Sequence, residues 1–197
     1  MMMRSLGRWM CLCLSLAACK GRGGVETGPI NADAFNLGVA TSLIQDNKVK
    51  NAQDFERAIN RRNINRADVD HDGRVDPIQV VETQDDDRRT FTLRAIPTSA
   101  KGQEPDKVAV PVATIDFVPD RKAQRVNVQA HYAPIVVGGP PFAFFVPVVY
   151  QGDVIVAPTG SFFYWLLVIQ RPIYVGVIYV DVQVYDDGHY KHKHRHK

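Results

Sequence analysis

One stretch of the chain decides the fold: Asp68-Val69-Asp70-His71-Asp72-Gly73-Arg74-Val75-Asp76-Pro77-Ile78-Gln79-Val80-Val81. Before it, apolar residues recur every three to four positions, which is the period of a helix. From Ile78 onward they alternate with polar residues, which is the period of a strand. Pro77 and this alternation exclude a helix immediately after the acidic residues. The stretch therefore joins a helical part of the chain to a β-sheet.

Two helices are expected before the acidic stretch and four strands after it. The first helix lies within residues 32–44, with Asp33 as its candidate N-cap, and the second covers residues 51–62, with Asn51 in that role. The expected strands cover residues 78–81, 90–95, 108–118 and 125–132. Pro111 favours an edge or a bulge in the third strand. Residues 32–132 are thus expected to form an α+β domain, with the helices packed on an antiparallel β-meander.

The acidic stretch has the spacing of the first part of an EF-hand calcium loop. Asp68, Asp70 and Asp72 occupy loop positions 1, 3 and 5, Gly73 occupies position 6 and Asp76 occupies position 9. Alternate side chains of a tightly curved loop point inward, so these carboxylates converge on a hard cation, and glycine permits the sharp turn. The expected calcium ligands are the side chains of Asp68, Asp70, Asp72 and Asp76 and the backbone carbonyl of Arg74.

The loop departs from an EF-hand at position 12, where Gln79 stands in place of the bidentate glutamate. We therefore expect weak binding, with a dissociation constant on the order of 10⁻⁴ M or poorer, which suits the millimolar calcium found outside the cytoplasm. The alternative interpretation is a solvated acidic turn without an ion.

Residues 1–18 have the layout of a secretory signal peptide. Arg4 and Arg8 precede an apolar run from Trp9 to Leu16, which is far shorter than the ~20 residues that span a bilayer. The residues Leu16-Ala17-Ala18-Cys19 resemble a bacterial lipobox. This resemblance implies cleavage before Cys19, a lipid anchor of the palmitate type on its thiol and a flexible tether over residues 19–31. The alternative is an ordinary signal peptide with a chance cysteine near its cleavage site.

The lipobox also bears on location. Lys20 stands where aspartate would retain a lipoprotein at the inner membrane. The resemblance therefore implies an exported, lipid-anchored envelope protein, attached to the outer membrane if the host has two membranes. Cys11 and Cys13 lie within the signal, so the mature domain has neither a free thiol nor a disulfide.

A second resemblance concerns the domain itself. The motif formed by Phe55-Glu56, Ile59-Asn60, Ile64-Asn65 and residues 68–82 looks like a group of uncharacterised bacterial exported proteins. In that group a helix, a turn that resembles a calcium loop and a strand follow in this order. The resemblance covers residues 35–130 and implies a fold unit, not an activity.

The chain becomes almost entirely apolar over residues 133–186. A hairpin is expected between Phe142–Tyr150 and Val154–Ala157. The apolar run Phe162–Val180 is long enough to cross a membrane, but Arg171 lies near its centre, where a charge costs about 2.5–3.5 kcal/mol. We therefore favour two shorter segments, packed on the domain or on a protein partner, over a membrane-spanning helix.

The last segment, residues 187–197, alternates histidines with lysines and arginine. It has two interpretations: a basic tail that contacts anionic lipid or polysaccharide, or a chelating tail for Zn²⁺, Ni²⁺ or Cu²⁺. The candidate ligands of the second interpretation are His189, His192, His194 and His196.

Charge and motifs exclude several function classes. Without Arg4, Arg8 and the four basic residues of the last seven positions, 18 basic residues face 21 acidic ones, so the basic isoelectric point belongs to the tail. A nucleic-acid-binding domain needs a clustered basic face and is not expected. No serine or histidine has the pattern of a catalytic pair, so we expect no enzyme.

The leading interpretation is a lipid-anchored envelope protein with a structural calcium loop. The alternatives are an assembly module using the apolar region and a metal-handling protein using the tail.

Overall fold

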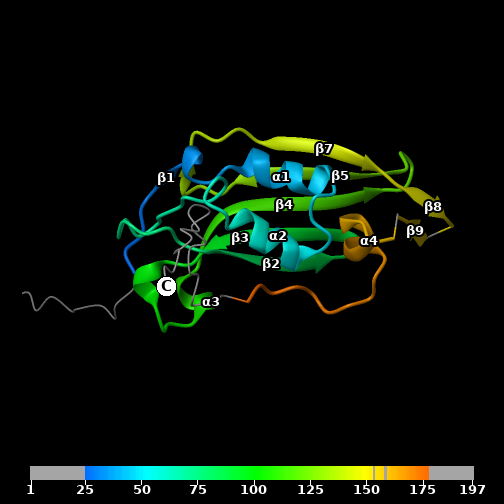
Figure 1. The fold of residues 1–197 in the computed structure, drawn as a ribbon. Coiled ribbons are helices and arrows are strands. Elements are labelled where there is room, and N and C mark those ends of the chain that lie inside the picture. Colours follow the sequence, from blue (N-terminus) through cyan, green and yellow to red (C-terminus); the bar gives the residue numbers. More distant parts are fainter. Residues whose placement is uncertain (1–24, 153, 158, 178–197) are drawn as a thin grey trace, which may run out of the picture.

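The computed structural model describes residues 25–152, 154–157 and 159–177. The predicted signal peptide, the predicted lipidation site Cys19 and the tail over residues 187–197 lie outside the described residues. Within these described residues, four helices and an antiparallel five-stranded sheet confirm the α+β fold class (Figure 1). The strand order is β2-β3-β4-β5-β7. The bounds are β2 (Ile78–Asp85), β3 (Arg88–Ala95), β4 (Val110–Asp120), β5 (Arg125–Tyr132) and β7 (Phe142–Pro147).

The predicted meander forms the first four strands, and the apolar region supplies the fifth. β7 pairs with β5 from Phe142 to Pro147, so the expected hairpin is shorter than predicted. Only β8 (Val149–Gln151) and β9 (Val154–Val156) pair there. Pro111 lies opposite Arg94, where the register between β3 and β4 shifts. Of the two alternatives that Pro111 suggested, an edge or a bulge, the structure supports the bulge, because β4 lies between β3 and β5.

The two helices before the sheet begin at asparagine caps. α1 (Leu37–Gln45) starts after Asn36, whose Oδ1 accepts a hydrogen bond from the Val39 amide at 2.9 Å. The expected Asp33 cap was wrong for this helix, because Asp33 lies in the separate 3-10 turn η1 (Ala32–Ala34). α2 (Ala52–Ile59) starts after Asn51, whose Oδ1 accepts from the Asp54 amide at 2.8 Å, as predicted.

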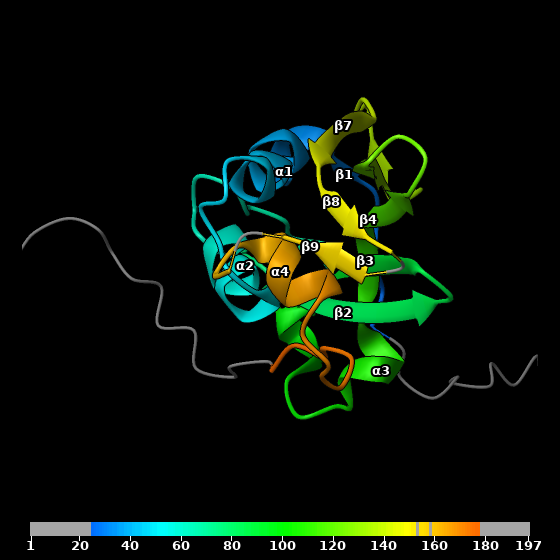
Figure 2. The same cartoon turned by 90° about the vertical axis from the view of Figure 1, so that its right-hand side faces the viewer.

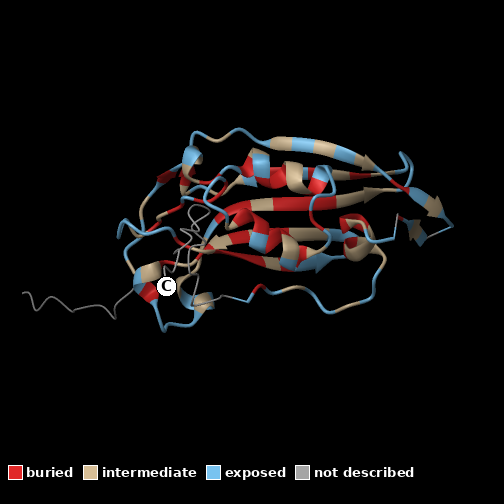
Figure 3. Cartoon of the chain, in the orientation of Figure 1, coloured by how far each residue is buried: buried red, intermediate tan, exposed pale blue. Residues whose placement is uncertain are grey.

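Helices α1, α2 and α4 cover one face of the sheet, and the core lies between the two layers (Figure 2). Buried residues gather along the strands and on the helix faces that meet them (Figure 3). Four fully buried phenylalanines from different elements join the layers: Phe55 in α2, Phe91 in β3, Phe117 in β4 and Phe162 in α4 (Phe162–Leu167). Phe91 lies 5.2 Å from Phe117 and 6.0 Å from Phe162 between ring centroids. The apolar region therefore contributes to the core of the domain.

Shorter elements complete the fold. β1 (Ile30–Asn31) pairs in parallel with β6 (Val136–Val137). The connection from β3 to β4 contains η2 (Thr98–Ala100) and α3 (Pro105–Val108). Among the described helices, none combines the length and apolar character needed to cross a membrane.

Residues 171–177, here named the C-terminal strap, run back along the outer edge of β2. The Glu82 amide donates to the Tyr174 carbonyl at 2.7 Å, and the Gly176 amide donates to the Val80 carbonyl at 2.8 Å. The segment after α4 thus turns at residues 170–172 and packs on the domain. By covering β2, the strap protects one edge of the sheet.

Buried carboxylates hold the strap in place. Glu82 is fully buried, and its oxygens accept two hydrogen bonds from the Arg171 guanidinium, at 2.6 and 3.0 Å. Arg89 bonds to the same carboxylate at 2.8 Å. Burial opposes ionisation of Glu82, but the bonds from Arg171 and the Tyr174 amide outweigh it and lower the pKa of Glu82. The strap is therefore fixed by a charged pair inside the protein.

Glu56 in α2 also faces the strap. It is 7% exposed, and its Oε2 accepts from the Val80 amide at 2.8 Å and its carboxylate accepts from the Tyr174 hydroxyl. A Cβ at Gly176 would lie 1.6 Å from that oxygen, so only glycine fits. Burial raises the pKa of Glu56 to about 7, although these hydrogen bonds oppose the shift.

Glu56 should make the stability of the domain depend on pH. Because its folded pKa lies above the ordinary 4.5, its stabilising contribution is complete below pH 4.5 and is lost as the pH rises through about 7. The Glu56→Gln variant should match the parent near pH 4.5. Near pH 8 it should be more stable, by up to about 3 kcal/mol. Urea unfolding with chelator across this range measures the difference, and a difference that does not change with pH would contradict the account.

Candidate metal centre

The acidic loop connects α2 to β2, and two asparagines close its base. Asn60 bonds to both backbone groups of Ile78, with its Oδ1 2.7 Å from the amide and its Nδ2 2.8 Å from the carbonyl. Asn65 donates to the Asp76 carbonyl at 2.8 Å and accepts from the Ala67 amide at 3.0 Å. The two ends of the loop are therefore fixed close together, independently of the aspartates between them.

The tight turn of the loop is built by backbone conformation and by Asp68. Gly73 has φ of +84°, which is left-handed backbone that favours glycine and confirms the predicted turn. His71 has φ of +56°. The two carboxylate oxygens of Asp68 accept hydrogen bonds from the amides of Asp72, at 3.1 Å, and Gly73, at 2.9 Å. Asp68 therefore curves the loop around its own carboxylate.

Asp70 and Asp76 bind the loop to the connection between β3 and β4. The Asp70 carboxylate accepts from the amide and the hydroxyl of Ser99. Burial opposes its ionisation, but these bonds outweigh burial and lower the pKa of Asp70. Asp76 is fully buried, and its oxygens accept from the amides of Val69, at 2.7 Å, and Thr98, at 2.8 Å.

The carboxylates of Asp68, Asp70 and Asp76 converge as the sequence predicted. One oxygen of each lies within 4.8 Å of the others, so this group can hold a metal ion. Asp68 and Asp70 are half-buried and Asp76 is buried. Burial, together with the charges of Asp70 and Asp68, raises the pKa of Asp76 to about 6, against the opposing effect of its two amide bonds. A cation between the three groups would favour the ionised form of Asp76.

Asp72 and Arg74 stand apart from this group. Asp72 is exposed, and its oxygens accept from the Arg74 amide at 2.8 Å and from the Thr98 hydroxyl at 2.6 Å. The Arg74 side chain is exposed. The structure thus brings together three of the four expected carboxylates and turns the fourth toward η2.

Sequence reasoning missed Thr98 and Ser99, which contact three of the loop's aspartates. They lie more than 20 positions after the loop, and no spacing rule for a calcium loop includes them. The one available signal was the Pro97-to-Pro105 interruption between two strands, which marks a connection but not its direction.

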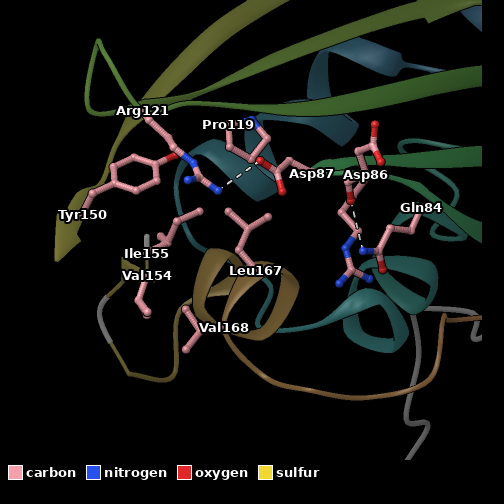
Figure 4. Close-up of a pocket in the computed structure, with 11 residues that line it drawn as sticks. Gln84, Asp86, Asp87, Pro119, Arg121, Tyr150, Val154, Ile155, Leu167 and Val168 are labelled. Atoms are coloured by element: carbon pink, nitrogen blue, oxygen red, sulfur yellow. Dashed lines mark hydrogen bonds and ion pairs between the residues drawn. The ribbon is translucent and has the colours of Figure 1, made fainter. Parts of the chain in front are cut away.

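A separate pocket opens at the far end of the sheet, between the β2–β3 turn, β8, β9 and α4 (Figure 4). Its volume is about 270 Å³. Val154, Ile155 and Leu167 form an apolar wall. Its arginines already have carboxylate partners, because Arg121 lies 3.3 Å from Asp87 and Arg89 bonds to Glu82. The pocket therefore presents no unpaired arginine to an anionic ligand, and none of the site residues expected from the sequence lines it.

Comparison of the chain with protein-family models, curated proteins and solved structures found no match.

Proposed function

We propose that this chain is a non-enzymatic lipoprotein of the cell envelope, anchored through Cys19, whose domain is braced by calcium. The observation that supports the calcium part is the convergence of Asp68, Asp70 and Asp76, with one oxygen of each within 4.8 Å of the others. Oxygen ligands of this kind suit a hard cation. The anchor and the absence of catalysis rest on the sequence patterns.

The contacts of the cluster define what the ion would do. Asp70 and Asp76 already bond to Ser99 and Thr98, which belong to a different connection of the sheet. An ion held by Asp68, Asp70 and Asp76 would therefore join the loop to the β3–β4 connection. It would also offset the repulsion among three nearby carboxylates. Both effects stabilise the folded domain, which is a structural role.

A second candidate function is an assembly module that uses the apolar C-terminal region. Strands β6 and β7 and helix α4 of that region pack within the domain, but three alternate side chains of the strap remain exposed. Ile173, Val175 and Val177 are 53%, 53% and 62% exposed. They form an apolar row beside β2, which is the feature that favours this candidate.

Calcium should raise the melting temperature of the domain. At about 1 mM calcium and a dissociation constant near 10⁻⁴ M, linkage adds about 1.4 kcal/mol of stability, which corresponds to roughly 3–6 °C. Magnesium should add much less, because it requires tighter octahedral geometry and retains its water. Thermal melts of the mature chain carrying Cys19→Ser, with chelator, calcium and magnesium in turn, test this expectation.

Matched double variants make the calcium test specific. Asp68→Asn with Asp70→Asn should abolish the calcium shift. Asp85→Asn with Asp86→Asn should keep it, since this pair removes the same charge from the exposed β2–β3 turn at the other end of the sheet. The calcium assignment fails if several millimolar calcium produces no shift, or if both double variants lose the shift equally.

The anchor has its own test. Cells that express the parent chain should incorporate labelled fatty acid into it, and the Cys19→Ser chain should remain unprocessed or be released without label. Fractionation and gel autoradiography measure both results. Equal labelling of the two chains would place the lipid elsewhere and refute Cys19 as the anchor.

A further inference from the structure

The arginines of the described residues divide into two groups. Seven lie within 4.0 Å of a carboxylate: Arg57, Arg88, Arg89, Arg94, Arg121, Arg125 and Arg171. The other four have no carboxylate partner among the described residues: Arg61, Arg62, Arg66 and Arg74. All four are exposed, and the Arg66 guanidinium donates only to the backbone carbonyl of Asp33. Unpaired arginines are thus confined to residues 61–74.

These arginines lie at one end of the molecule, here named the loop end and defined by residues 60–77. The loop end is where α2 leads into β2 (Figure 1). Asp68 engages both of its carboxylate oxygens with amides of its own loop. Asp70 and Asp76 bond to the neighbouring β3–β4 connection. Asp68, Asp70, Asp72 and Asp76 thus equal the four arginines in formal charge, but their oxygens are bonded within the protein. The guanidinium groups of Arg61, Arg62 and Arg74 have no carboxylate partner among the described residues and can meet an external phosphate.

The N-terminal segment enters the domain at the same end. The Gly28 amide donates to the Val69 carbonyl at 2.8 Å, and a Cβ at Gly28 would lie 2.6 Å from the His71 ring, so the segment crosses directly over the loop. Gly28 follows Cys19 by nine positions, and nine extended residues span about 30 Å at most. A lipid on Cys19 would hold the loop end within that distance of the bilayer.

An apolar side chain completes the surface. Val75 is 43% exposed and follows Arg74 directly. In the headgroup region of a bilayer, phosphate groups lie close to acyl-chain carbon. A cation beside an exposed aliphatic side chain can contact both, the cation at the phosphate and the aliphatic side chain at the acyl carbon. Arginine forms bidentate hydrogen bonds with phosphate.

We propose that the loop end docks on anionic phospholipid headgroups of the membrane that holds the lipid of Cys19. Arg61, Arg62, Arg66 and Arg74 contact the phosphates, and Val75 lies at the headgroup level. The proposal rests on the lipidation of Cys19 in the proposed function. A cation between Asp68, Asp70 and Asp76 would offset the charge of these aspartates and strengthen the attraction.

The mature lipidated chain has no free cysteine, so single probes can be placed on it. Val75→Cys and Val149→Cys, each labelled with a nitrobenzoxadiazole fluorophore, compare the loop end with β8 at the opposite end of the sheet. Val149 is 57% exposed. The chains are reconstituted in vesicles of equal phosphatidylglycerol and phosphatidylcholine that contain a headgroup-region nitroxide quencher. Quenching should be several-fold stronger at position 75, and equal or reversed quenching would overturn the proposal.

Matched charge variants identify the contacts. Each arginine near an anionic surface strengthens docking about fivefold, so Arg61→Gln, Arg62→Gln and Arg74→Gln together should weaken docking about 100-fold. Quenching at position 75 should then fall to the level of position 149, as it should in vesicles of phosphatidylcholine alone. Lys48→Gln, Lys50→Gln and Lys122→Gln remove three exposed charges that have no carboxylate partner in the described part of the chain. They lie at the opposite end of the sheet, so this triple variant should leave quenching unchanged. Equal effects of the two triple variants would overturn the proposal.

Mass spectrometry of the peptide that contains Cys19 distinguishes a failure of the lipid anchor from a failure of docking. A peptide without lipid would refute the anchor, and the docking proposal with it. A lipidated chain that floats with the vesicles but shows no quenching at position 75 would refute docking alone.

Discussion

The buried carboxylate of Asp76 is the constraint on which the structure of the loop end depends. A charged group inside a protein is costly unless hydrogen bonds or an opposite charge compensate it. Asp76 receives amides from Val69 and Thr98, and its own amide donates to the Ala67 carbonyl at 2.7 Å. One residue thus positions the loop, the β3–β4 connection and the start of β2. The raised pKa of Asp76 shows that these bonds compensate the burial only in part, and a cation would supply the remaining compensation.

Buried acidic groups also organise the outer edge of β2. Glu82 and Glu56 are buried acidic groups that face the C-terminal strap, and each finds partners on it: Arg171 and the Tyr174 amide for Glu82, and the Tyr174 hydroxyl for Glu56. Arg171 also lies over the Trp165 ring at 3.4 Å from its centroid, so the turn after α4 is fixed from both sides. Apolar packing builds the core, while buried acids determine which distant segments close over it.

The sequence predicted the features that depend on residues close together in the chain. The spacing at which apolar residues recur predicted that helices precede the strands of the sheet. Asn51 identified the start of a helix, and Pro111 indicated the position of the bulge. The spacing of Asp68, Asp70 and Asp76 predicted a cluster that is present. Contacts between distant segments could not be predicted in this way. Nothing near Asp72 indicates that Thr98 will bind it. Nothing in the apolar run before Arg171 indicates that its charge will pair with Glu82, 89 positions earlier.

The central claim is that the cluster of Asp68, Asp70 and Asp76 binds calcium. Equilibrium dialysis of the mature Cys19→Ser chain against radioactive calcium tests this claim most directly. The account predicts saturation at about one ion per chain, half-complete at a concentration on the order of 10⁻⁴ M, with excess magnesium competing weakly and Asp68→Asn with Asp70→Asn removing the binding. No binding at several millimolar calcium, or binding that survives the two substitutions, would contradict it.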